Sequence, residues 1–169
     1  EDLAGIGVLT PHLLANVAAA SALARAAGIE PAAIRNALLN FRLDAHRIEL
    51  VAEHNSVTWI DDSKATNPHA AAASLNSFDS VVWVVGGLLK GVDISPLVEQ
   101  FAGKLRAAIV IGADRQPVLD ALAAKAPDVP VSEISVADNG EIMPAVVAAA
   151  DAYAHPGDTV LLAPSSASM

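Results

Sequence analysis

Polar residues that are able to bind a small molecule gather in three short segments of the sequence. Residues 61–69 read D-D-S-K-A-T-N-P-H, residues 86–91 read G-G-L-L-K-G, and residues 164–168 read P-S-S-A-S. Each segment directly follows a stretch that suits a β-strand. Carboxylates, hydroxyls, amides and lysines supply the donors, acceptors and charge that hold polar or anionic ligands. We therefore predict that the three segments together bind a small polar molecule.

The same residues also have purely structural interpretations. Asp61, Asp62 or Asn67 can cap a helix that begins at Pro68. Glycine pairs form plain turns, loop lysines are usually solvated, and serines are common in loops. A metal site made from Asp61, Asp62 and His69 is less favoured, because the carboxylates have easier roles with hydroxyls or as caps. Taken one by one, the segments do not decide between these interpretations.

Several well-defined catalytic motifs are missing from the sequence. There is no G-x-x-x-x-G-K-[ST] segment, so the chain carries no P-loop of its own. The glycine pair at 86–91 does not fit G-x-G-x-x-G, which argues against a dinucleotide fingerprint there. No G-x-S-x-G segment supports a hydrolase.

Apolar runs that suit strands covered on both faces alternate with amphipathic helices along most of the chain. The expected strands are a hairpin at 48–51 and 57–60, three apolar runs at 81–85, 107–111 and 159–163, and a weaker strand at 129–134. This alternation predicts an α/β fold, a Rossmann-like, mostly parallel sheet with flanking helices. Ligands of such sheets bind outside the carboxyl ends of the strands, so the three polar segments should meet at one edge.

Capping signals mark the ends of the expected helices. Besides the helix that would begin at Pro68, helices are expected at 10–27, 31–40, 96–105, 116–126 and 139–154. Thr10 and Ser95 are expected to cap the helices that follow them, and Asp138 with Glu141 forms a possible capping box for the last one.

The composition is that of a globular protein and excludes several classes of function. The 169 residues are 53% hydrophobic and 17% charged, with a net charge of −9. A nucleic-acid binder needs a basic face, which 10 basic residues among 19 acidic ones do not provide. The absence of cysteine excludes disulfides and thiolate metal sites. Because the sequence shows no long apolar run and no signal peptide, we expect a cytoplasmic protein without membrane insertion.

The segment 61–68 resembles the D-S-K-A-T-N signature of the D-glutamate-adding members of the Mur ligase family. Four further matches to that family follow in order: H-x-x-x-N at His12 and Asn16, H-R at His46 and Arg47, G-G-x-x-K at 86–90, and L-x-P-x-x-A-S at 162–168. The resemblance implies that residues 1–43 are the last helices of the family's central ATP-binding domain. Residues 44–169 would then be its C-terminal domain, with a hinge at 41–46.

The resemblance also implies a reaction and its partners. In this family ATP, with Mg2+, phosphorylates the carboxylate of UDP-N-acetylmuramoyl-L-alanine, and the amine of D-glutamate attacks the acyl phosphate. The metal ligands and the P-loop are expected outside this chain, so the chain alone should be inactive. The whole enzyme is expected to be a cytoplasmic monomer of peptidoglycan precursor synthesis, with no nucleic-acid partner.

Two groups of ligand-binding residues and one loop-orienting pair follow from the same resemblance. They are Thr66, Lys90 and Ser168 for D-glutamate, Asn16, Arg47 and Asp62 for ATP, and Lys64 and Asn67 for orientation of the loop. Arg47 would meet phosphate oxygens, Asp62 the ribose hydroxyls, and Asn16 the adenine edge. We assign no catalytic base and no metal ligand within this chain.

The chain departs from the family pattern in two places. Leu13 stands where the family often has a second asparagine that contacts adenine, so this contact would depend on Asn16 and on backbone. The family's D-x-F motif after A-S-x is not part of the chain. Two other interpretations stay open: another amide ligase of the superfamily, of folylpolyglutamate or cyanophycin type, and a non-enzymatic Rossmann-like binding module.

Overall fold

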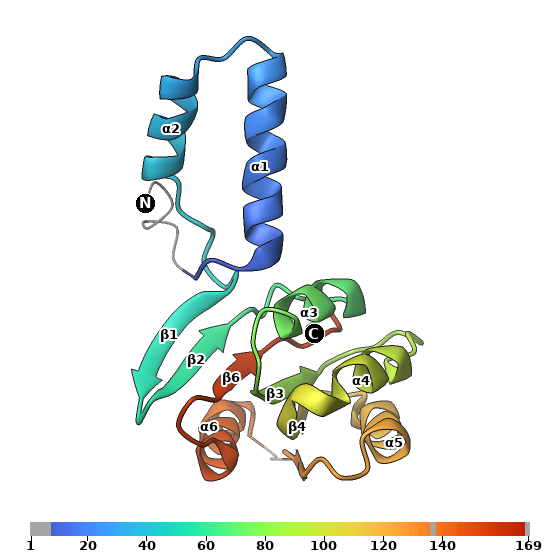
Figure 1. Ribbon diagram of the computed structural model, residues 1–169. Coiled ribbons are helices and arrows are strands. Elements are labelled where there is room, and N and C mark those ends of the chain that lie inside the picture. The colour runs from blue at the N-terminus through green and yellow to red at the C-terminus, as the bar shows by residue number, and fades with distance from the viewer. Residues whose placement is uncertain (1–7, 136–137, 168–169) are drawn as a thin grey trace.

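The computed structural model describes residues 8–135 and 138–167, and its centre is a six-stranded sheet (Figure 1). The strands are β1 (Glu49–His54), β2 (Val57–Asp61), β3 (Val81–Gly86), β4 (Leu105–Ile111), β5 (Val131–Glu133) and β6 (Thr159–Leu162). Their order across the sheet is β1-β2-β6-β3-β4-β5, and every neighbouring pair is parallel except the β1–β2 hairpin. The prediction of a mostly parallel sheet is therefore confirmed.

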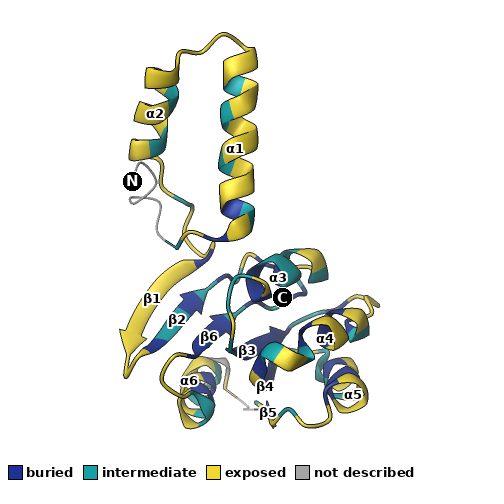
Figure 2. Ribbon diagram, viewed as in Figure 1, coloured by how far each residue is buried: buried dark blue, intermediate teal, exposed yellow. Residues whose placement is uncertain are grey.

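Helices cover both faces of the sheet (Figures 1 and 2). The helices α3 (Pro68–Leu75), α4 (Ser95–Phe101) and α5 (Arg115–Lys125) pack on one face, and α6 (Ile142–Tyr153) packs on the other. Alternate side chains of a strand point to opposite faces, and in β3 the side chains on both faces are apolar. Val81 and Trp83 lie in the core under α3, α4 and α5, while Val82 and Val84 lie in the core under α6.

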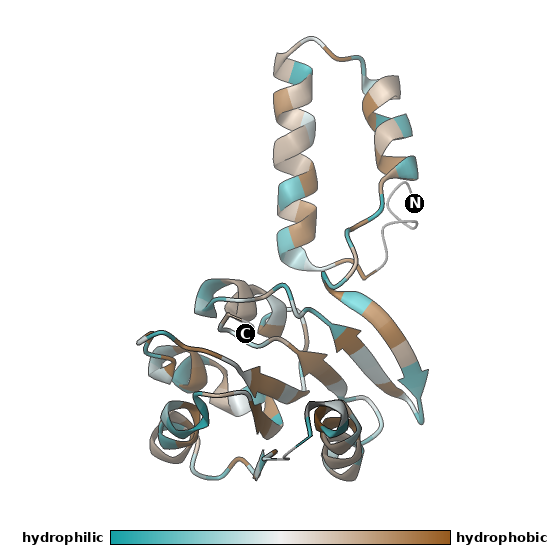
Figure 3. Ribbon diagram, turned by 180° about the vertical axis from the view of Figure 1, so that it is seen from behind, coloured by the Kyte–Doolittle hydropathy of each residue, from teal (hydrophilic) through white to brown (hydrophobic). Residues whose placement is uncertain are grey.

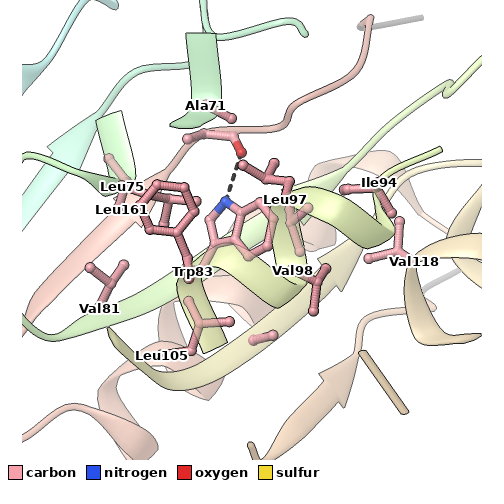
Figure 4. Close-up of a cluster of buried hydrophobic side chains, with 14 of the residues drawn as sticks. Ala71, Leu75, Val81, Trp83, Ile94, Leu97, Val98, Leu105, Val118 and Leu161 are labelled. Atoms are coloured by element: carbon pink, nitrogen blue, oxygen red, sulfur yellow. Dashed lines mark hydrogen bonds between the residues drawn. The ribbon is translucent and has the colours of Figure 1, made fainter. Parts of the chain in front are cut away.

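Trp83 lies at the centre of the larger core (Figure 4). Its side chain is fully buried, in one cluster with Leu75 of α3, Val98 of α4 and Leu161 of β6. The indole Nε1 donates a hydrogen bond to the main-chain oxygen of Ala163 at 2.9 Å, and a buried indole N–H usually requires such a partner. This bond joins the core to the residue that lies between β6 and the third polar segment.

Two helices stand apart from the sheet in the N-terminal part of the chain (Figures 1 and 3). The first, α1 (Pro11–Ala26), begins after Thr10, whose hydroxyl accepts the Leu13 N–H at 3.4 Å and caps the helix as predicted. The second, α2 (Pro31–Asn40), lies alongside it. Several of their apolar side chains are exposed, and Leu23 is 72% exposed. Among the described residues, no helix is long and apolar enough to cross a membrane.

The helix α4 differs from its prediction at both ends. Ser95 is the first residue of the helix and not its cap, while the Asp93 carboxylate accepts the Ser95 N–H at 2.9 Å. The helix ends at Phe101 because a 3-10 turn, η1 (Ala102–Lys104), leads directly into β4. Leu105 pairs with Val81 in the sheet. It therefore belongs to β4, although its spacing in the sequence also suited the helix.

The last helix also begins later than expected. A 3-10 turn, η2 (Asn139–Glu141), precedes α6, which starts at Ile142. The Asp138 carboxylate accepts the Gly140 N–H at 2.8 Å, so it closes this turn instead of capping the helix. The capping box predicted for Asp138 and Glu141 is therefore wrong.

Candidate functional site

The three polar segments follow β2, β3 and β6, and these strands are neighbours in the sheet. Backbone hydrogen bonds join the segments to one another. The Ser165 N–H donates to the Ala65 oxygen at 2.9 Å, and the Leu88 N–H donates to the Ala167 oxygen at 3.0 Å. The predicted meeting of the segments at one edge of the sheet is therefore confirmed for the residues that the structure describes.

A fourth segment, at the end of β4, supports the glycine pair and was not predicted. The Asp114 carboxylate accepts the Leu89 N–H at 2.9 Å, and the Asp114 N–H donates to the Gly87 oxygen at 2.9 Å. Gly112 lies so close to Gly87 that a Cβ atom on Gly112 would overlap the Gly87 backbone. A glycine directly after the apolar run 107–111 is the signal in the sequence that points to this loop.

A cavity of about 230 Å³ lies between the N-terminal end of α1 and the loop after β2. Its lining includes all three residues predicted to bind ATP, which are Asn16, Arg47 and Asp62. Lys64 and Leu13 also line it. The structure thus brings together three residues that lie far apart in the sequence and that the family resemblance assigns to one ligand.

The side chain of Asp62 is buried against this cavity. Its Oδ1 atom accepts the Ile48 N–H at 3.3 Å, and its Oδ2 atom accepts the hydroxyl of Ser74. A carboxylate offers about four lone-pair positions, so acceptor capacity remains for a ligand. Asp62 therefore joins the loop after β2 to residue 48 and to α3 while it can still accept from ligand hydroxyls.

Two cations of the cavity, Arg47 and Lys64, share an exposed counter-ion. The Oδ2 atom of Asp44 lies 3.7 Å from Arg47 Nε and 3.5 Å from Lys64 Nζ. The Asp44 side chain is 73% exposed and the Arg47 side chain 55%. Exposed ion pairs contribute little free energy, so a polyanionic ligand can replace Asp44 at small cost. The cavity therefore fits an anionic ligand.

The residues predicted to bind D-glutamate do not line this cavity, as far as the described residues show. Thr66 is exposed in the loop after β2, and Lys90 is exposed in the turn after the glycine pair, where its φ is 53°. Ser168 lies outside the described residues. The D-glutamate roles therefore stay predictions.

The loop-orienting pair makes main-chain and capping contacts. The Oδ1 atom of Asn67 accepts the Ala70 N–H at 2.9 Å and so caps α3, which is its structural interpretation. The Lys64 N–H donates to the His46 oxygen at 3.3 Å. The Lys64 contact is made by the main chain, so the loop-orienting role of its side chain stays a prediction.

A group of ionisable residues beside Arg47 was not predicted. The His46 Nδ1 atom lies 2.7 Å from Asp61 Oδ2, and the His46 N–H donates to Glu49 Oε2 at 2.7 Å. Burial by itself would raise the pKa of Asp61. Hydrogen bonds from His46 and Ser63, with the charge of His46, outweigh burial and hold that pKa below its ordinary value.

The same side chains are a possible metal-ligating group. One ligand atom from each of His46, Glu49 and Asp61 lies within 4.8 Å of the others. The set considered from the sequence, Asp61, Asp62 and His69, does not form such a group among the described residues. One oxygen of Asp62 is instead engaged by a serine hydroxyl of α3.

The family described as "Mur ligase, glutamate ligase domain" matches residues 46–166, which is more than half of the chain. The chain belongs to the Mur ligase family. Its fold agrees with this membership. The structure of UDP-N-acetylmuramate-alanine ligase from Thermotoga maritima matches this Mur ligase chain with a TM-score of 0.66. That match covers 95% of this chain and 36% of the other, and its 15% identity shows a shared fold alone.

Relatives of this Mur ligase chain carry the name UDP-N-acetylmuramoylalanine--D-glutamate ligase. The protein of that name from Leifsonia xyli is 55% identical, and the match covers all of this chain and 33% of the relative. The one from Thermobifida fusca is 52% identical, and the match covers 99% of this chain and 36% of the relative. The chain therefore spans about a third of the length of these relatives.

Proposed function

We propose that this chain is the glutamate-ligase part of an ATP-dependent enzyme that joins D-glutamate to UDP-N-acetylmuramoyl-L-alanine through an acyl phosphate. The observation that carries the proposal is the cavity that Asn16, Arg47 and Asp62 line together. The names of the relatives from Leifsonia xyli and Thermobifida fusca support the same function. The enzyme would act as a monomer in the cytoplasm, in the synthesis of peptidoglycan precursors.

The cavity residues fit the parts of ATP. The Arg47 guanidinium presents a planar fork of donors that suits phosphate oxygens, and Lys64 adds a second positive charge on the same cavity. Asp62 has acceptor capacity for ribose hydroxyls, and the Asn16 amide can donate to and accept from the adenine edge. When bound, ATP supplies the phosphoryl group that activates the substrate carboxylate, and we place the Mg2+ ligands outside this chain.

D-Glutamate would bind at the neighbouring edge of the sheet, where the three polar segments meet. Lys90 supplies a positive charge for a carboxylate of D-glutamate, and the Thr66 hydroxyl supplies a hydrogen bond that orients this carboxylate. Ser168 would complete the site. The hydrogen bonds that join residues 65 and 165, and residues 88 and 167, support this placement because they hold the three segments together.

Residues 1–43 would belong to a central ATP-binding domain, and residues 44–169 to the C-terminal domain. Two observations support this division: the family match begins at residue 46, and α1 and α2 stand apart from the sheet (Figure 1). The cavity lies between the two parts. Movement about a hinge at 41–46 would therefore open or close the ATP site.

ADP release by the full-length protein tests this function. We expect release that requires UDP-N-acetylmuramoyl-L-alanine and D-glutamate together, with little release when L-glutamate replaces D-glutamate. Release with a folate or a peptide acceptor instead would indicate another amide ligase of the superfamily, and no release with any acceptor would indicate a binding module. Residues 1–169 alone are expected to release no ADP, because they contain no P-loop.

A further inference from the structure

The backbone on both sides of Arg47 has an unusual conformation. His46 and Ile48 have positive φ angles of 66° and 46°. Such angles are uncommon for residues that carry a side chain, and for a β-branched residue such as isoleucine they are strained. Strained backbone persists only where surrounding contacts enforce it, and it is frequent at ligand sites.

Several contacts enforce this conformation. His46 is held at three points: its N–H donates to Glu49 Oε2 at 2.7 Å, its carbonyl oxygen accepts the Lys64 N–H at 3.3 Å, and its ring Nδ1 lies 2.7 Å from Asp61 Oδ2. Ile48 is held by its buried side chain and by the bond from its N–H to the Asp62 carboxylate. The residue between them therefore has a fixed backbone and a largely exposed side chain.

Asp61 is the group that reaches the imidazole. It is the last residue of β2, so the sheet fixes its position. Its Oδ1 atom accepts the Ser63 N–H at 2.8 Å, which leaves Oδ2 directed at His46. Its side chain is 20% exposed, and partial burial strengthens a hydrogen bond of this kind. Asp61 itself does not line the cavity that contains Arg47.

We propose that Asp61 is a positioning residue for nucleotide binding. By fixing the His46 ring it holds the left-handed turn that directs the Arg47 guanidinium into the cavity. Glu49 supports the same turn through the His46 N–H. This inference rests on the proposed function, in which Arg47 binds the phosphates of ATP.

The test compares Asp61→Ala and Asp61→Asn in the full-length protein. For Asp61→Ala we expect the KM for ATP to rise about tenfold, which is about 1.4 kcal/mol of binding. The kcat and the KM for D-glutamate should change less than about twofold, because binding of ATP alone is weakened. Asp61→Asn keeps an oxygen that accepts from the imidazole N–H, so its KM for ATP should stay within about threefold of the parent value.

A double-mutant cycle shows whether Asp61 acts through His46. His46→Ala is expected to raise the KM for ATP as Asp61→Ala does. The double variant should be no worse than His46→Ala alone, because the two residues share one contact. Glu53→Ala is the matched control: Glu53 is exposed on β1 and pairs with Thr58, and its change should leave all three kinetic parameters as they were.

Two results would overturn the positioning role. The first is that Asp61→Ala lowers the thermal stability of the protein and raises the KM for ATP and the KM for D-glutamate alike. The second is that the effects of Asp61→Ala and His46→Ala on the KM for ATP add up in the double variant. An unchanged KM for ATP in Arg47→Ala would end the proposal as well, since nothing would remain to be positioned. If the parent protein releases no ADP, the Kd for ATP of the same variants, measured by calorimetry, still tests the positioning role. Weaker ATP binding by both Asp61→Ala and Arg47→Ala would then support that role, although the proposed reaction has failed.

Discussion

The indole of Trp83 in β3 donates a hydrogen bond of 2.9 Å to the main-chain oxygen of Ala163, the residue directly after the neighbouring strand β6. Trp83 is fully buried, so water does not compete for this bond. Its acceptor is the residue directly before the polar segment 164–168. A single contact therefore joins the centre of the core to the edge of the sheet where ligands are proposed to bind.

Replacing Trp83 with phenylalanine is expected to lower the free energy of unfolding by about 1–3 kcal/mol, because a buried carbonyl oxygen loses its donor. The smaller ring adds a packing defect to this loss. Urea denaturation of the variant and the parent protein measures the difference. Trp59→Phe is the control, since Trp59 is only half-buried on β2. Equal losses in the two variants would contradict a special role for the bond to Ala163.

Asp158 is expected to make the stability of the fold depend on pH. Its carboxylate accepts from Arg106 Nε at 3.0 Å and from the His155 N–H at 2.8 Å. Burial by itself would raise the pKa of Asp158, but hydrogen bonds from Arg106, Ser80 and His155, with the charge of Arg106, hold it below its ordinary value. A lowered carboxyl pKa stabilises the fold above the ordinary pKa, and this contribution is lost as the pH falls through the lowered value.

Asp158→Asn should therefore destabilise the protein by about 1–3 kcal/mol at neutral pH. The difference between the variant and the parent should begin to shrink as the pH falls below the ordinary aspartate pKa of about 4, because the unfolded chain takes up its proton before the folded one does. Denaturation midpoints measured from pH 3 to pH 8 check both statements. Asp151→Asn, at an exposed position of α6, should show neither effect. A constant difference at every pH would exclude the ionised form of Asp158 as the cause.

Gly87→Ala is expected to disturb the D-glutamate edge by pushing two segments apart. A Cβ atom at residue 87 would lie 2.5 Å from Ser166 Oγ and 2.8 Å from the Ala167 oxygen. The KM for D-glutamate should rise about tenfold or more, equivalent to about 1.4 kcal/mol per tenfold step. Gly91→Ala also places an alanine at a positive φ, but its Cβ would meet open space. Matching kinetics in the two variants would mean that the contact with residues 166 and 167 is not the cause.

Lys90→Ala tests the binding of D-glutamate itself. Hydrogen bonds to charged groups contribute about 1.5–3 kcal/mol, so the KM for D-glutamate should rise by roughly 10- to 100-fold. The Kd for ATP should not change, because Lys90 does not line the cavity of Arg47. Lys125→Ala removes a lysine of α5 that pairs with Glu99 at 3.1 Å and should leave both values as they were. An unaltered KM for D-glutamate in Lys90→Ala would show that Lys90 is an ordinary solvated lysine.

The sequence was informative where the signal was local or periodic. Apolar runs indicated β3, β4 and β6, and alternation indicated the β1–β2 hairpin. Parallel strands require their carboxyl-end loops to share an edge, so the meeting of the three polar segments was predictable. The cap at Thr10 was likewise predictable, because a hydroxyl three residues before the N–H it accepts is a local pattern. The end of α4 was not predictable from the sequence, because Leu105 fits a helical repeat and an apolar strand equally well.

Contacts that depend on packing were outside the reach of the sequence. The bond between Ser74 and Asp62 requires the position of α3 on the sheet, and no local pattern specifies it. The pair of His46 and Asp61 requires the register of the β1–β2 hairpin, in which Glu49 lies opposite Asp61. Both contacts determine how the predicted ligand residues are held, which residue types alone do not show.

The position of β6 in the sheet has a consequence for synthesis of the protein on the ribosome. This strand follows the other five in the sequence, yet it lies between β2 and β3. Until it has emerged from the ribosome, the hairpin of β1 and β2 has no parallel partner, and the apolar strand β3 has one unpaired edge. Both halves of the sheet therefore have unpaired edges, which can pair wrongly with each other or with neighbouring chains until β6 is available.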